Sequence, residues 1–108
     1  MGDIYERAKE LGNALARTGE YRALRQAIDV ADEDRELVEL RNRIRDLGAE
    51  IETAMRASRE PDEDITKAYT ELTEELQAKP GFQELISAQA NFEKVMFKVN
   101  ETVTKGIE

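Results

Sequence analysis

Apolar residues recur at alternating steps of three and four positions between Asp32 and Ser58, and this spacing constrains the fold more than any other feature of the chain. The residues concerned are Leu37, Leu40, Ile44, Leu47, Ile51 and Ala54. Most residues between them are charged, so one stripe of a long helix can be buried while the opposite face stays in water. Such a helix spans about 40 Å, and the rest of the chain must supply the helices that cover it.

The same periodicity and the breaks between apolar runs predict helices near 3–17, 19–31, 33–58, 62–78 and 81–105. Asp3 has a capping-box partner at Glu6, and Thr18 is a suitable N-cap for the second helix. Asp32, followed by two further acidic residues, predicts the start of the long third helix. Pro61 and Pro80 are expected at the first positions of the last two helices.

No strand pattern is present, so we predict an all-α fold, an antiparallel helical bundle built on two long amphipathic helices. The 108 residues are expected to form a single domain over 1–108. The short breaks at Ser58–Pro61 and Lys79–Gly81 should reverse or sharply bend the chain. The alternative is a kink at Pro80 that joins the fourth and fifth helices into one bent rod. Gly48 inside the third helix indicates a close helix approach or a mild bend.

Net charge is −8, from 24 acidic and 16 basic residues, which disfavours nucleic acid as a partner, and we expect no direct DNA binding. Residues 1–59 hold 11 basic and 13 acidic residues, whereas 60–108 hold 5 and 11, so the C-terminal half is the more acidic. The chain has no Cys and no His, which excludes disulfides, thiolate catalysis and histidine chemistry. No apolar run resembles a signal peptide or a membrane span, and we expect a cytoplasmic protein.

Paired carboxylates at Glu36/Glu39, Glu60/Glu63 and Glu71/Glu74 are the acidic spacings that suggest metal chemistry. Di-iron bundles also need histidine, and magnesium sites need carboxylates from two helices, so we expect no catalytic residue, no metal and no cofactor.

The arginines between residues 41 and 59 could form a nucleic-acid patch, but Glu39 lies four residues before Arg43 and Glu52 four before Arg56, which favours local ion pairs. Only Arg41 and Arg45 share a face without an evident partner.

The last predicted helix carries a wide apolar stripe that exceeds what one partner helix can cover. Its central residues are the predicted homodimer interface: Phe92, Val95, Met96, Val99 and Val103. Gln89 lies at a stripe position, where it either sets the register as a buried polar group or marks a half-exposed end of the stripe.

The order of these features resembles the YlbF/YmcA (Com_YlbF) family of small helical regulators. The resemblance rests on helix boundaries and apolar positions: Ala8, Leu11, the stretch 18–21 (Thr-Gly-Glu-Tyr), Leu24, Ala27, Asp32, Leu76, Pro80, Phe82, Ala88, Phe92, Val99 and Val103. It implies an all-α protein that associates with itself or with relatives. It also implies a role like that of regulators of competence, sporulation and biofilm formation, in a complex that influences ribonuclease-dependent mRNA processing. Iron–sulfur clusters held by cysteines in some members cannot form here.

The first functional hypothesis is therefore a non-enzymatic regulatory adaptor that acts through protein–protein contacts, as a homodimer or with related family members or a ribonuclease complex. The alternative is a metal-dependent hydrolase that uses the paired carboxylates. Direct RNA binding is a third possibility that the net charge disfavours.

Overall fold

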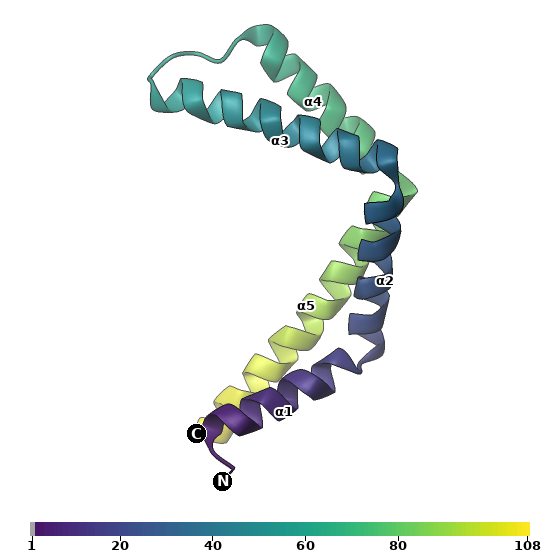
Figure 1. The fold of residues 1–108 in the computed structure, drawn as a ribbon. Coiled ribbons are helices and arrows are strands. Elements are labelled where there is room, and N and C mark those ends of the chain that lie inside the picture. The colour runs from purple at the N-terminus through teal and green to yellow at the C-terminus, as the bar shows by residue number, and fades with distance from the viewer. Residues whose placement is uncertain (1) are drawn as a thin grey trace. The chain divides into compact units, whose positions relative to one another are not determined.

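The computed structural model describes residues 2–108, which form five α-helices and no strand (Figure 1). The helices are α1 (Ile4–Ala16), α2 (Gly19–Glu33), α3 (Arg35–Arg56), α4 (Glu63–Gln77) and α5 (Pro80–Ile107). The predicted all-α class is confirmed, and each predicted helix is present. α4 and α5 are separate helices, and Pro80 is the first residue of α5, as predicted.

The chain divides into two compact units, which are described in turn. The first unit comprises the residues up to Asp29 together with Glu84–Glu108, and the second unit comprises Val30–Gln83. The single domain over 1–108 stays a prediction. Within residues 2–108, no helix is both long enough and apolar enough to cross a membrane.

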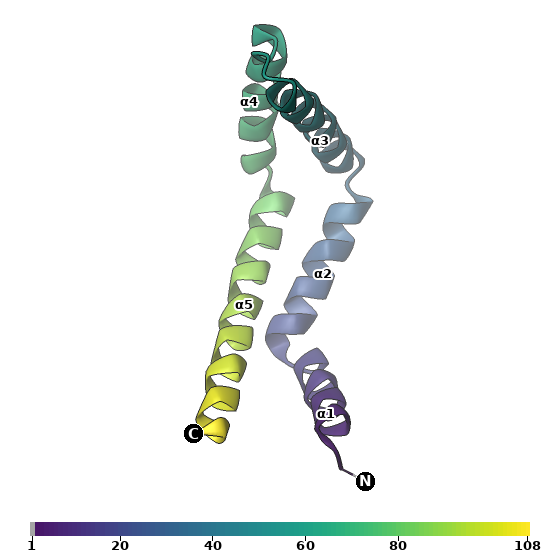
Figure 2. The same ribbon diagram turned by 90° about the vertical axis from the view of Figure 1, so that its left-hand side faces the viewer.

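In the second unit, α3 and α4 pack side by side and run antiparallel (Figures 1 and 2). The buried side chains of α3 are Leu37 and Leu40, and that of α4 is Leu76. The chain reverses between these helices, as the break at Ser58–Pro61 predicts. The apolar spacing therefore specifies which face of the long helix packs on its partner.

Gly48 lies where α4 comes close to α3. A Cβ atom at this position would lie 3.3 Å from Cε2 of Tyr69, which is tighter than an ordinary contact. Of the two explanations for this glycine, close approach is the one that the structure supports, because the Tyr69 side chain occupies the space a larger residue would need.

Side-chain caps define several helix ends. Oδ1 of Asp3 accepts from the amide of Glu6 at 2.7 Å, and Oγ1 of Thr18 accepts from the amide of Tyr21 at 3.1 Å, so both predicted caps are confirmed. The predicted start at Asp32 is wrong. Asp32 belongs to the last turn of α2, and Asp34 caps α3 by accepting from the amide of Leu37 at 3.1 Å.

The start of α4 also differs from the prediction by a short distance. Pro61 precedes the helix instead of beginning it, and Asp62 is the N-cap, with Oδ1 accepting from the amide of Asp64 at 2.9 Å. Proline has no side-chain acceptor for a first-turn amide, whereas aspartate supplies one.

In the first unit, α2 and α5 lie side by side and antiparallel (Figures 1 and 2). The rings of Tyr21 and Phe92 join them, with centroids 5.5 Å apart at 59°. The buried residues of this unit are Ala27, Leu85 and Ala88. α1 contributes no buried residue. Most apolar side chains of the first unit therefore remain partly or largely in contact with solvent.

Candidate functional site

The five residues of the predicted interface lie on one face of α5 in the first unit. Phe92, Val95, Met96 and Val99 are half-buried, and Val103 is 51% exposed. Phe92 is partly covered by Tyr21 of α2, so the stripe packs on its own chain toward one end and is more open toward the other. Whether it forms a dimer interface stays a prediction. Gln89 is exposed, which fits an open end of the stripe better than a buried polar group.

Several apolar side chains outside the predicted interface are more exposed than the stripe itself. Phe97 lies on the side of α5 away from the stripe and is 71% exposed. In α1, Ile4 and Tyr5 are about four-fifths exposed, at 78% and 81%. Sequence periodicity identifies an apolar face on α1 but not whether another helix covers it. The sequence does carry a signal for Phe97: the residues three and four positions before and after it, which share its helix face, are all polar, namely Glu93, Lys94, Asn100 and Glu101.

A shallow groove of about 730 Å³ runs between α2 and α5 in the first unit. Its lining residues are Gly19, Glu20, Ala23, Asn91, Lys94, Val95, Lys98 and Val99. Two of them, Val95 and Val99, belong to the predicted interface. The acidic residue of the lining comes from α2 and both basic residues come from α5, so the two sides of the groove differ in charge.

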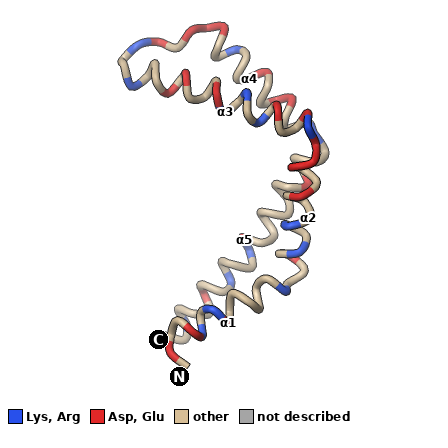
Figure 3. Tube along the Cα trace, viewed as in Figure 1, with Lys and Arg blue, Asp and Glu red and all other residues tan. Residues whose placement is uncertain are grey.

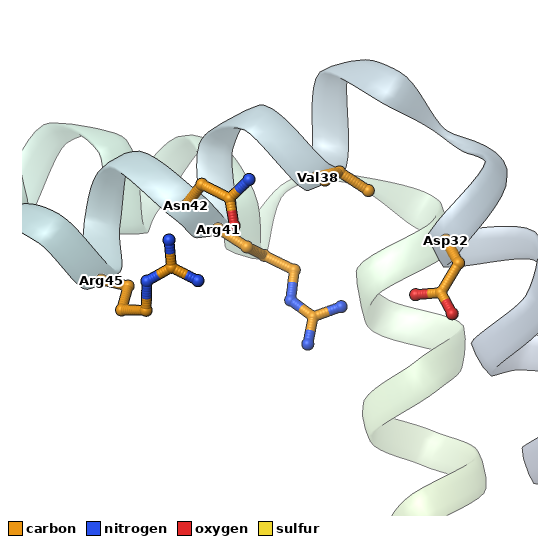
Figure 4. A pocket seen from close by; sticks show the side chains of 5 residues that line it. All are labelled: Asp32, Val38, Arg41, Asn42 and Arg45. Atoms are coloured by element: carbon orange, nitrogen blue, oxygen red, sulfur yellow. The ribbon is translucent and has the colours of Figure 1, made fainter.

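In the second unit, a pocket of about 390 Å³ has two arginines in its lining (Figure 4). The lining residues are Asp32, Val38, Arg41, Asn42 and Arg45. Arg41 forms no ion pair within residues 2–108, and the contact of Arg45 with its neighbour Asp46 is 3.6 Å. A nucleic-acid backbone requires a track of many basic residues, whereas this lining holds two arginines and one aspartate.

Of the two arginine ion pairs that the sequence predicts, one is present in the structure and one is absent. Arg56 donates to Oε1 of Glu52 at 2.6 Å, which confirms that pair. The Glu39–Arg43 pair is absent from the ion pairs of residues 2–108, so that prediction is wrong. Exposed helix pairs are worth only a few tenths of a kcal/mol, and this gain competes with the entropy of holding two long side chains together.

The paired carboxylates do not assemble into a metal site in the part of the chain that the structure describes. Acidic residues occur along much of α4 (Figure 3), but no three acidic side chains of residues 2–108 come together in a way that could hold a metal ion. Glu36 instead accepts from Nζ of Lys79, with 2.9 Å between Nζ and Oε2.

The ion pair between Lys79 and Glu36 changes the ionisation of the lysine. The hydrogen bond from Lys79 to Glu36 raises the pKa of Lys79 above its ordinary value, and desolvation opposes this effect without cancelling it. The charges of Glu36, Asp34 and Glu75 add to the increase. The Lys79 side chain is only 20% exposed, whereas that of Glu36 is 67% exposed, so this pair is shielded from solvent on the lysine side alone.

The fold and these surfaces define a small all-α protein whose distinguishing features are exposed helix faces. Over residues 4–108 the chain matches the family model described as "Control of competence regulator ComK, YlbF/YmcA", and it belongs to this family. The predicted resemblance is confirmed.

Similar proteins include several that are named UPF0342 protein. The one from Lactobacillus acidophilus is 25% identical over 107 residues, covering 99% of this chain and 92% of the relative. One from Limosilactobacillus reuteri is 24% identical over 106 residues, covering 98% and 86%. One from Leuconostoc citreum is 22% identical over 105 residues, covering 97% and 89%. No solved structure matches the chain.

Proposed function

We propose that this protein is a non-enzymatic regulatory adaptor that acts through contacts between its helix faces and other proteins, a second copy of itself among them. The observation that carries the proposal is the exposure of large apolar side chains in the first unit, above all Phe97 and Tyr5. Burying a side chain of this kind is worth about 1.5–3 kcal/mol, so these faces favour association.

The family description concerns control of the competence regulator ComK, and this supports a regulatory role. The proposed partners are related family members or a ribonuclease complex, as the resemblance implies. The self-association is proposed to use α5, with Phe92, Val95, Met96, Val99 and Val103 in the interface. The half-burial of four of these residues leaves apolar area that a second chain can cover.

Two experiments separate the adaptor from the alternative enzyme. Affinity capture from extracts of the source cells compares the wild type with Phe97→Ser and with Thr102→Ser, an exposed α5 residue. We expect at least one specific protein to be retained by the wild type and Thr102→Ser and lost with Phe97→Ser. Equal capture by all three chains would contradict the proposal.

Calorimetric titration with Mg²⁺ and with Mn²⁺ tests the hydrolase directly. The adaptor requires no saturable binding of either ion, whereas a carboxylate-based hydrolase requires it. A saturable heat of binding that disappears in Glu71→Gln/Glu74→Gln would contradict the adaptor and favour the hydrolase.

A further inference from the structure

We propose that the groove between α2 and α5 binds the same groove of a second copy, in a twofold arrangement that places Glu20 of each copy opposite Lys94 of the other. This inference rests on the proposed self-association and adds the surface, the symmetry and the residues that set them.

The groove has the shape and chemistry that a helical partner requires. Val95 and Val99 supply apolar contact area on the α5 side, and Gly19 and Ala23 are small residues that allow close approach on the α2 side. The three buried residues of the first unit, Ala27 in α2 and Leu85 and Ala88 in α5, are not part of this lining, so the groove lies apart from them. A second copy would bury this lining, which its own chain leaves open.

The charges that line the groove favour a second copy of this chain as the bound partner, and they also determine its orientation. Glu20 comes from the α2 side, whereas Lys94 and Lys98 come from the α5 side. Lys98 is already paired with Glu101 at 3.1 Å. Glu20 and Lys94 form no ion pair within residues 2–108. A groove with one acidic and one basic side is complementary to itself when its two sides are exchanged.

The acidic side of one groove faces the basic side of the other for only one direction of a twofold axis that lies in the interface. An axis parallel to the groove brings the α2 side of one copy opposite the α5 side of the other, so Glu20 meets Lys94 twice. An axis across the groove would place like charges opposite each other. The resulting dimer is a four-helix arrangement of α2 and α5 from both copies.

Charge-reversal variants test this pairing by sedimentation equilibrium at low salt. Glu20→Lys and Lys94→Glu each convert both contacts of a homodimer into like-charge contacts, and we expect the dissociation constant to rise about tenfold for each. An equimolar mixture of the two variants should regain wild-type affinity within about twofold, because the mixed dimer contains two opposite-charge contacts. Pairing within one chain cannot explain this recovery, since each variant chain carries like charges at both positions.

Glu93→Lys is the matched control, because it makes the same change of charge next to Lys94 in the sequence at a residue outside the groove lining. It should leave the dissociation constant within about twofold of the wild type. A mixture as weak as its two components would overturn this inference, as would a wild-type dimer that neither reversal weakens. A monomeric wild type would overturn the proposed self-association as well. Circular dichroism of each variant establishes that the helices are retained.

Discussion

Lys79, the second residue after the end of α4, forms an ion pair with Glu36 in the first turn of α3. The sequence does not predict this pair, because the two residues are far apart in the chain and meet only when the α3–α4 hairpin forms. The Glu52–Arg56 pair was predictable, since a spacing of four residues places both side chains on one face of a helix, but Glu39 and Arg43 have the same spacing and form no ion pair within residues 2–108. Spacing therefore shows which contacts within a helix are possible, whereas contacts between helices require the fold.

The raised pKa of Lys79 gives the pair a defined pH dependence. A lysine whose pKa is raised in the folded state stabilises the fold at pH values below its ordinary pKa of 10.5, and this contribution is lost as the pH rises through the folded pKa. We therefore expect Glu36→Gln to lower the urea midpoint at pH 8, and the difference from wild type to disappear at high alkaline pH. Glu39→Gln, which removes no ion pair of residues 2–108, should show no such dependence. A wild-type midpoint equal to that of Glu36→Gln at pH 8 would refute this role.

Gly48 gives a second prediction at the residue scale. Replacing it by alanine gains about 1 kcal/mol of helix propensity but requires Tyr69 to move by a few tenths of an ångström. The Tyr69 side chain is partly exposed and can shift toward solvent. We expect Gly48→Ala to raise the free energy of unfolding by about 0.5 kcal/mol, and Gly48→Leu to lower it by more than about 1 kcal/mol. Urea denaturation measures both, and a stabilising leucine would show that the contact with Tyr69 is unimportant.

The helices themselves were largely predictable because caps, prolines and apolar periodicity agree with one another. The main error, the start of α3, has a structural reason. Three consecutive acidic residues, 32–34, could each serve as the cap, and sequence favours none of them. Ala31 is fully buried, and burial of this residue in the last turn of α2 extends that helix beyond Asp32. Tertiary packing thus decides between caps that are locally equivalent.

Just after α3, Ser58 adopts a left-handed backbone conformation that favours glycine over serine. Ser58 has φ of 56°, and its amide donates to the carbonyl of Met55 at 3.1 Å while the amide of Arg59 donates to that of Ala54 at 2.9 Å. This is the Schellman arrangement, in which glycine is preferred at the left-handed position.

Ser58→Gly should therefore raise the free energy of unfolding by about 0.5–1 kcal/mol, and Ser58→Val should lower it by about 1 kcal/mol or more. Urea denaturation of the two variants checks the prediction. Ala57→Gly is the matched control, because Ala57 precedes Ser58 and has φ of −85°, where glycine has no advantage, and we expect no gain from it. A destabilising Ser58→Gly would contradict the assignment of this helix end.

For the whole molecule, the sequence predicted an apolar stripe on α5 but not which apolar faces lack a cover. Ile4, Ala8, Leu11 and Leu15 recur at steps of three and four residues and so share one apolar face of α1, yet no residue of α1 is buried. Periodicity reports which side of a helix is apolar, and it contains no information on the partner. The candidate surface was therefore only partly predictable: the polar residues around Phe97 on its helix face indicate an isolated apolar position, whereas the exposed fractions of Phe97 and Tyr5 required the structure.

We propose that the chain associates with itself through the α5 face of the first unit, and sedimentation equilibrium at high micromolar concentration measures this association. The wild type should sediment as a dimer, and Val99→Glu should shift the distribution to monomer, because a buried unpaired carboxylate costs several kcal/mol or must take up a proton. Val99 is a better choice than Phe92, whose ring also contacts Tyr21 within the chain. Ser87→Glu, an exposed α5 position, should remain dimeric. A monomeric wild type, or a Val99→Glu variant as dimeric as the wild type, would show that the α5 face is not a dimer interface.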